Sequence, residues 1–219
     1  MRQTECTGST LEFASLKSRR IVADFDGGAL TSDGGGLLLR EVNRHLGLIE
    51  SLAACIPDPR DPAKIRHDLE TLLAQRVYAI ALGYEDGNDH ATLRRDGILQ
   101  MLAGRPVDPE QPLGSPSTLC RLENSIDRAT LGRMSEVFVE LFIASHSKPP
   151  KRIVLDFDAT DDPVHGQQEG RFFHGYYDRY CFLPLYVFCG DQLLAAYLRP
   201  ANRDPARHSR AILKLLVTR

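Results

Sequence analysis

The stretch Ile153-Val-Leu-Asp-Phe-Asp158 decides how the second part of this chain folds. Its second half alternates apolar and acidic side chains, and an alternation with a period of two is typical of a β-strand. On a strand, Asp156 and Asp158 lie on one face, while Leu155 and Phe157 lie on the other. The sequence therefore predicts a strand that presents two carboxylates on the same face.

These two carboxylates indicate a metal site. Close carboxylates repel each other, which raises their pKa values unless a cation lies between them. Oxygen ligands of this kind suit hard divalent cations such as Mg²⁺ and Mn²⁺. We therefore predict Asp156 and Asp158 as metal ligands. The alternative is that hydrogen bonds alone satisfy Asp156, and that Asp161 and Asp162 cap a turn before Pro163.

Downstream of this stretch the pattern stays extended. Aromatic or β-branched runs cover residues 171–177, 181–189 and 192–199, and Gly190-Asp191 suits a two-residue hairpin loop. They predict three antiparallel strands. A helix is then predicted to begin at Asp204-Pro205.

Upstream the periodicity is helical, after a predicted short strand at residues 20–26. Leu69 to Ala81 repeats apolar residues at helical spacing, with Asp68 as the N-cap and Gly83 at the end. Further helices are predicted from Leu37 to Ile49, after the N-cap and N1 pair Ser115-Pro116, and from Asp127 with Leu131 on its buried side.

The predicted fold is mixed α/β with two domains. The polar, proline-broken stretch 145–152 separates a mainly helical domain, residues 1–148, from a domain of antiparallel strands plus a helix, residues 149–219. With 42% hydrophobic and 26% charged residues, the composition excludes a disordered chain, and a net charge of -2 excludes a wholly basic nucleic-acid coat. No membrane span or export signal is visible, and five scattered cysteines indicate a cytoplasmic protein.

Any nucleic-acid surface must therefore be local, and two candidates stand out. Arg203, Arg207, Arg210 and Lys214 are spaced to form one stripe along the predicted last helix, either for phosphate contact or as an ordinary solvated face. On the helix after Pro116, Arg121 and Asn124 have the donor and acceptor groups that contact phosphates or read base edges.

The carboxylate segment resembles two families of enzymes. Over eight residues it is similar to the first motif of haloacid-dehalogenase-like phosphatases, which implies Asp156 as nucleophile and Asp158 as general acid/base. That fold needs a parallel sheet, whereas antiparallel hairpins are predicted here. The phosphatase is therefore the lesser alternative.

A resemblance to bacterial insertion-sequence transposases covers most of the chain. Its N-terminal motifs are Phe25-Asp-Gly-Gly28, Ser32-Asp-Gly-Gly-Gly-Leu-Leu-Leu-Arg40, Gln75-Arg-Val-Tyr-Ala-Ile-Ala-Leu-Gly-Tyr-Glu-Asp86 with Asn88-Asp89, and Ser117-Thr-Leu-Cys-Arg-Leu-Glu-Asn124. Its later motifs are Leu155-Asp-Phe-Asp-Ala-Thr160, His165-Gly-Gln167, His174-Gly-Tyr-Tyr177, Phe182-Leu-Pro-Leu185 and Leu198-Arg-Pro200. The second set is similar to the first part of an RNase H-like DDE catalytic domain.

The resemblance implies DNA transposition by metal-dependent strand cleavage and transfer at the terminal inverted repeats of an element. Two Mg²⁺ or Mn²⁺ ions held by three carboxylates perform this chemistry, and Asp158 matches the first of the three. The positions of the second Asp and of the Glu fall past Arg219. We therefore expect a truncated, catalytically incomplete transposase. The metal ions are expected in the complete enzyme, and one alternative is that this chain alone binds none. The alternative is a non-catalytic DNA-binding or inhibitory fragment that also contacts itself or full-length transposase.

Overall fold

The computed structural model describes residues 11–16, 18–23 and 31–218. Strands β1 (Leu11–Leu16) and β2 (Arg19–Ala23) form an antiparallel hairpin. The strand predicted at residues 20–26 is thus confirmed over its first part, and its last residues lie outside the described residues. The motif Phe25–Gly28 lies outside them as well.

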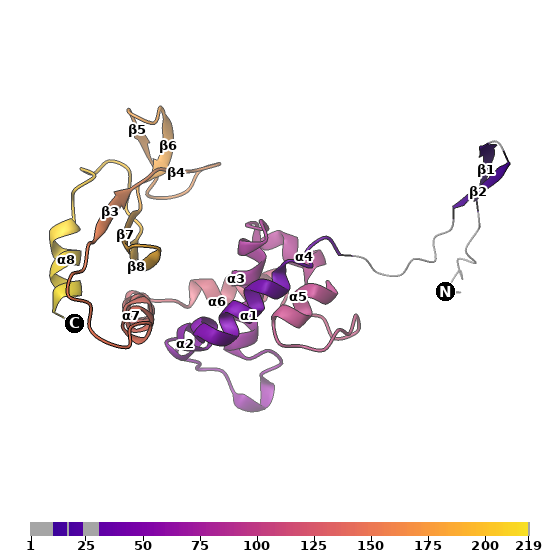
Figure 1. The fold of residues 1–219 in the computed structure, drawn as a ribbon, viewed down its shortest axis with the longest axis horizontal. Coiled ribbons are helices and arrows are strands. Elements are labelled where there is room, and N and C mark those ends of the chain that lie inside the picture. The colour runs from indigo at the N-terminus through magenta and orange to yellow at the C-terminus, as the bar shows by residue number, and fades with distance from the viewer. Residues whose placement is uncertain (1–10, 17, 24–30, 219) are drawn as a thin grey trace.

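All the described helices except the last one lie between residues 36 and 144 (Figure 1). In order they are α1 (Gly36–Leu46), α2 (Leu48–Ala54), the 3₁₀ turn η1 (Pro62–Lys64), α3 (Leu69–Ala81), the 3₁₀ turn η2 (Gly87–Asp89), α4 (His90–Leu93), α5 (Gly97–Leu102), α6 (Pro116–Asn124) and α7 (Arg128–Ala144). The proline-rich segment between α5 and α6 contains no helix, as predicted.

Helix α3 is the centre of this region. The Asp68 carboxylate accepts a hydrogen bond from the Thr71 amide at 2.7 Å, and Gly83 takes a φ of 95° after the last turn, so both predicted ends are confirmed. The buried face was only partly predicted. Gln75 and Tyr78 are buried because α2, α5 and α6 contact α3 from different sides, whereas Ile80 is 48% exposed.

Two other helices also differ from the sequence prediction. The first predicted helix is two helices, because Gly47 adopts a left-handed conformation with a φ of 64° and ends α1 before Ile49. Helix α7 begins as predicted, with the Asp127 carboxylate accepting from the Thr130 amide at 2.7 Å. Leu131 is exposed rather than buried, and the buried residues of α7 are Thr130 and Phe142.

The predicted strands form two small antiparallel sheets. One sheet has the order β3-β7-β8, with β3 (Asp156–Ala159), β7 (Leu185–Cys189) and β8 (Gln192–Tyr197). The other has the order β4-β6-β5, with β4 (Asp162–Pro163), β6 (Arg179–Phe182) and β5 (Phe172–His174). The run predicted as one strand over residues 181–189 is therefore β6 and β7, which belong to different sheets and are separated by Leu183-Pro184.

The first sheet contains one predicted hairpin, β7–β8, and its third strand, β3, comes from an earlier part of the chain. The pairing of Cys189 with Gln192 confirms the two-residue loop Gly190-Asp191 between β7 and β8. Leu185 and Val187 of the central strand are fully buried. Strand β3 pairs only with β7 among the described strands, so it lies at an edge of the sheet.

The last helix, α8 (Ser209–Val217), begins later than the sequence predicted. Asp204 forms a turn instead, in which its carboxylate accepts from the Ala206 amide at 2.7 Å and its carbonyl from the Arg207 amide at 3.0 Å. His208 then takes a φ of 74°, a left-handed conformation that keeps the preceding turn from continuing into α8.

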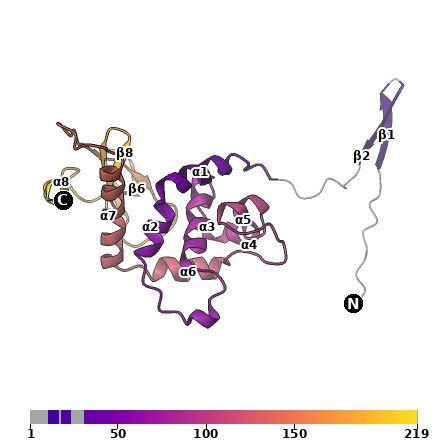
Figure 2. The same cartoon turned by 60° about the horizontal axis from the view of Figure 1, so that its bottom comes forward.

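Helix α7 lies between the helices and the first sheet, and it contacts both α2 and β8 (Figure 2). The Arg133 guanidinium donates two hydrogen bonds to the Cys55 carbonyl at the end of α2, at 3.1 and 3.0 Å. At its other end, Ser145 is hydrogen-bonded to the Gln192 side chain. No helix in the described part of the chain is long and apolar enough to cross a membrane.

Candidate functional site

The two predicted metal ligands lie on β3. Asp156 pairs in register with Phe188 and Asp158 with Tyr186, so backbone hydrogen bonds to β7 hold both positions. Both aspartates are exposed, while Phe157 between them is half-buried. Within the described residues, neither carboxylate has a hydrogen-bond donor or a cation as its partner. The strand therefore presents two uncompensated carboxylates on one face, as predicted.

The other two aspartates of the acidic run have different surroundings. The Asp161 carboxylate lies 3.8 Å from the Arg179 guanidinium and is only partly exposed. Asp162 begins β4 opposite Phe182. Burial raises the pKa of Tyr177, and the nearby charges of Asp161 and Asp158 raise it further. Asp161 is thus paired as a structural residue would be, in contrast to Asp156 and Asp158.

The described residues do not form a complete metal centre. No group of three His, Cys, Asp or Glu side chains within them is arranged to hold a metal ion. Asp156 and Asp158 fit the oxygen chemistry of Mg²⁺. A centre that takes three carboxylates therefore needs at least one ligand besides this pair.

The basic residues near the end of the chain do not form one helical stripe. Only Arg210 and Lys214 lie on α8, one turn apart, because Arg203 and Arg207 belong to the bend and turn that precede it. The predicted stripe of four is wrong for this reason. All four side chains are nevertheless exposed, and no carboxylate pairs with any of them within the described chain.

A fifth basic residue of this segment, Arg199, is internal. Arg199 is 1% exposed, and its guanidinium donates to the carbonyls of Leu183 at 2.8 Å, Pro205 at 3.0 Å and Arg207 at 2.6 Å. Burial lowers the pKa of Arg199. The sequence shows Arg199 only as part of the motif Leu198-Arg-Pro200, and its internal role was not predicted because no local sequence signal indicates it.

Arg121 and Asn124 are both exposed on α6. Ser115 is the N-cap residue and Pro116 the first residue of the helix, as predicted, although the Ser115 hydroxyl does not cap a backbone amide. The Arg121 side chain donates to the Thr118 hydroxyl at 3.3 Å, and the Asn124 amide lies 3.2 Å from the Cys120 sulfur. Both exposed side chains keep spare hydrogen-bonding groups, and Arg121 also lines a cavity of the helical region.

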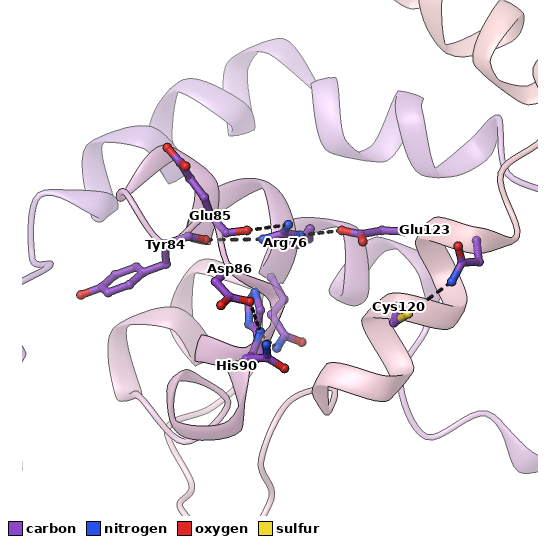
Figure 3. A network of polar contacts seen from close by, with 10 residues as sticks. Arg76, Tyr84, Glu85, Asp86, His90, Cys120 and Glu123 are labelled. Atoms are coloured by element: carbon purple, nitrogen blue, oxygen red, sulfur yellow. Dashed lines mark hydrogen bonds and ion pairs between the residues drawn. The ribbon is translucent and has the colours of Figure 1, made fainter. Parts of the chain in front are cut away.

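The most connected polar cluster joins three motif segments (Figure 3). Arg76 of α3 forms an ion pair with Glu123 of α6 at 2.6 Å and donates to the carbonyls of Tyr84 and Glu85. The Tyr84 hydroxyl donates to the Asp33 carboxylate at 2.8 Å. These motif residues therefore bind segments of the helical region to one another.

Gln75 of α3 also joins separate segments of the helical region, through hydrogen bonds inside the core. Its side-chain amide donates to the Gly114 carbonyl and accepts from the Gly114 amide, both at 2.9 Å. It also contacts the His90 ring nitrogen Nδ1 at 3.0 Å, and both side chains are fully buried. Burial lowers the pKa of His90, and the charge of Arg76 lowers it further.

Comparison with known families decides what these regions belong to. A family model described as Transposase DDE domain group 1 matches residues 13–219. The chain belongs to this family. No curated protein and no solved structure gives a significant match.

Membership places this transposase chain in DNA transposition, with DNA as the family's substrate and divalent metal ions as its usual cofactors. The match includes both the helical region and the sheets, so the motifs of the two regions are parts of one family pattern. The predicted α/β class agrees with the family and with the observed helices and antiparallel sheets.

Proposed function

We propose that Asp158 is a metal-ligating catalytic carboxylate for DNA strand cleavage and transfer at insertion-sequence ends, with Asp156 as a second ligand. The observation that carries this proposal is the state of the two side chains on β3. Both are exposed and lack a partner among the described residues. Asp161, by contrast, is paired with Arg179 and is therefore less available to a cation.

When bound at this strand, Mg²⁺ or Mn²⁺ would activate water or a 3′-hydroxyl and stabilise the leaving oxygen. The chain's own contribution is to hold the two carboxylates in place. Four register pairs with β7 fix β3, and the buried residues Leu185 and Val187 anchor β7. Because the described residues include no third ligand near this pair, we infer that they do not complete the catalytic centre without further carboxylates.

DNA contact by this chain is the second part of the proposal. Arg203, Arg207, Arg210 and Lys214 are exposed and unpaired among the described residues, which supports contacts with backbone phosphates. Arg121 and Asn124 project from α6 as groups that suit base edges or phosphates at the terminal inverted repeats.

A non-catalytic role is the alternative that a specific observation favours. Two carboxylates without a third do not form a two-metal site, yet the basic groups stay available to DNA. A chain of this kind would bind element ends, or full-length transposase, and compete with the active enzyme. The phosphatase alternative has less support, because every described pair of strands is antiparallel.

The metal proposal is tested by titrating the whole chain with Mn²⁺ and following the electron paramagnetic resonance signal of the free ion. We expect Asp158→Asn to weaken binding by at least about tenfold, as substitutions around a metal site typically do. Asp191→Asn is the matched control, since it removes the same charge from an exposed turn of the same sheet. Equal Mn²⁺ affinity in the wild type and in Asp158→Asn would overturn the assignment.

The completeness of the centre is tested with Mg²⁺ and a duplex that carries an element end. We expect no nicking or strand transfer by this chain alone. Metal-dependent nicking that disappears in Asp158→Ala would contradict the inference that further carboxylates are needed, while supporting the role of Asp158.

The two DNA surfaces are distinguished by how binding depends on salt. Replacing Arg203, Arg207, Arg210 and Lys214 by Gln is expected to flatten the log-log salt dependence by about 0.9 for each phosphate that the variant no longer binds. Arg121→Ala and Asn124→Ala are expected instead to reduce discrimination between element ends and random duplex. A salt slope and a discrimination ratio that stay unchanged in these variants would refute both surfaces.

A further inference from the structure

A cavity of about 520 Å³ lies in the helical region, between the segment that follows α2 and the start of α6. The wall on one side comes from residues 57–67, which include η1, and on the other side from α6 and from Arg94 after α4. Its apolar floor contains Leu72 and Leu113, both about 1% exposed. The cavity is therefore built on the core of the region.

The lining of this cavity is strongly basic. Five of its residues are Lys or Arg, and a single one, Asp58, is acidic; the cations are Arg60, Lys64, Arg66, Arg94 and Arg121. Asp58 is already bound, because its carboxylate accepts from Arg60 at 2.7 and 2.6 Å. Lys64 lies 3.6 Å from Asp61. Three cations, Arg66, Arg94 and Arg121, have no carboxylate partner among the described residues.

Two polar atoms of lining residues are buried without a partner. His67 Nδ1 and Arg94 Nε are both shielded from solvent, and neither meets a hydrogen-bond partner among the described residues. Buried polar atoms nearly always have such a partner, because leaving one unpaired costs free energy. A ligand with several acceptor oxygens would satisfy a guanidinium in this position.

The start of α6 adds donors of a second kind. The Ser115 and Thr118 hydroxyls both line the cavity and lie 2.9 Å from each other. Ser115 occupies the N-cap position without capping a backbone amide. The positive end of the nine-residue helix therefore lies at the cavity together with two hydroxyl groups.

We infer that this cavity is a phosphate-binding site in which Arg94, Arg66 and Arg121 bind the phosphate oxygens and the α6 hydroxyls orient them. Phosphate oxygens suit the lining better than a single carboxylate, because three arginines without a carboxylate partner line the cavity from the segment after η1, from the end of α4 and from α6. The shared chemistry is the phosphate group itself, whether it belongs to a DNA backbone or to a small molecule. DNA as the source rests on the proposed function.

His67 offers a reporter inside the same cavity. Burial lowers its pKa, and the charges of Arg66, Arg105 and Arg94 lower it further, whereas Asp68 raises it. The remaining charged groups of the lining are Asp58, Arg60, Lys64 and Arg121. A bound phosphate adds negative charge beside the ring, so it is expected to raise the pKa of His67.

The first arm of the test uses inorganic phosphate and the whole chain at constant ionic strength. We expect saturable shifts of the His67 ring signals in nuclear magnetic resonance spectra. Arg94→Gln is expected to weaken the apparent affinity for phosphate by about tenfold, the typical effect of removing one charge-assisted hydrogen bond. Arg128→Gln, an exposed position on α7 outside the cavity, removes the same charge as a control.

Folding is controlled separately. The Arg94 carbonyl accepts from the Leu113 amide at 2.8 Å, and this backbone bond remains in any side-chain variant. Arg94→Lys keeps the charge without the fork of donors and is expected to lose part of the affinity. Variants are compared after circular dichroism has established an unchanged melting temperature.

The second arm uses duplex DNA. If the phosphate comes from a DNA backbone, Arg94→Gln flattens the log-log salt slope by about 0.9 while Arg128→Gln does not. Saturable phosphate binding with an unchanged DNA slope would support the site and overturn DNA as its source. Shifts that never saturate, or that are equal in Arg94→Gln and the wild type, would overturn the site. Failure of the phosphate arm does not bear on the proposed role of Asp158, because that arm contains neither metal nor DNA.

Discussion

The helical region and the sheet region use their polar motif residues in opposite ways. In the helical region, Gln75 and His90 are fully buried and contact each other, and Gln75 also forms hydrogen bonds with the Gly114 backbone. On β3, Asp156 and Asp158 are exposed and have no partner among the described residues. The first set determines the shape of the molecule, whereas the second is free to meet a ligand. Membership in a sequence motif therefore does not distinguish a structural residue from a ligand-binding one, whereas the contacts of its side chain do.

Gln75→Ala is expected to have the largest effect, and it tests whether the buried motif residues stabilise the helical region. It leaves the buried amide and carbonyl of Gly114 without their partner, at about 1 to 3 kcal/mol for each unpaired group. We expect unfolding to become easier by about 3 kcal/mol, measured in urea. Gln168→Ala, in an exposed loop, is the control and is expected to stay within about 0.5 kcal/mol. A Gln75→Ala protein as stable as this control would refute the structural role of the motif.

Arg199 is a buried polar residue of the sheet region, in contrast to the exposed aspartates of β3, and Arg199→Ala tests its role. Three carbonyls lose their donor, but the bonds to Pro205 and Arg207 are only part-buried, so water can replace the donor there. We therefore expect a loss of about 2 kcal/mol, with faster amide hydrogen exchange in β7, β8 and the turn before α8. Arg203→Ala removes a neighbouring exposed charge and is the matched control. Exchange that rises equally in the helical region would mean that Arg199 does not act locally.

Glu123→Gln is expected to have a smaller effect. The Arg76 side chain is largely buried while that of Glu123 is about half exposed, so solvent weakens the pair, which contributes about 1 kcal/mol or less. Arg76 keeps its bonds to the Tyr84 and Glu85 carbonyls in this variant. The measurement is the midpoint of urea unfolding, with Glu110→Gln in the exposed loop before α6 as the control.

The smallest expected effect is a pH dependence from His90. Burial lowers the pKa of His90 in the folded state, so the unfolded chain binds more protons below the usual histidine pKa of about 6.5. Stability is therefore complete above that pH and falls as the pH is lowered toward the folded-state pKa. His90→Gln is expected to reduce this slope between about pH 6.5 and 5.5, while the exposed His45→Gln leaves it unchanged. An identical slope in both variants would contradict the assignment.

Local patterns predicted the parts of the structure that depend on local chemistry. The cap Asp68, the start of a helix at Asp127, the loop Gly190-Asp191 and the exposed face of β3 follow from side chains within a few residues of each other. The start of α8 could not be predicted from local side chains. In a helix beginning at Asp204, the Pro205 and Arg207 carbonyls would accept from amides one turn later, but they accept from Arg199 instead.

The same limit applies to the candidate sites. Alternation along the strand sufficed to predict that Asp156 and Asp158 share a face, and the structure agrees. The basic cavity was not predicted, because Arg66, Arg94 and Arg121 come from three segments that are far apart in the sequence and line one cavity only in the folded chain. Sequence spacing carries no information about such a meeting. Whether Asp158 binds a metal stays a prediction.

The position of β3 at the edge of its sheet has a consequence for the design of inactive variants. An edge strand exposes unpaired backbone groups that recruit strands from other molecules, and charged side chains are a common defence against this. Asp156 and Asp158 are the only charges on β3. Replacing both with Asn would remove a barrier to self-association together with the proposed ligands. The oligomeric state of such a variant therefore has to be measured before its loss of activity is attributed to chemistry.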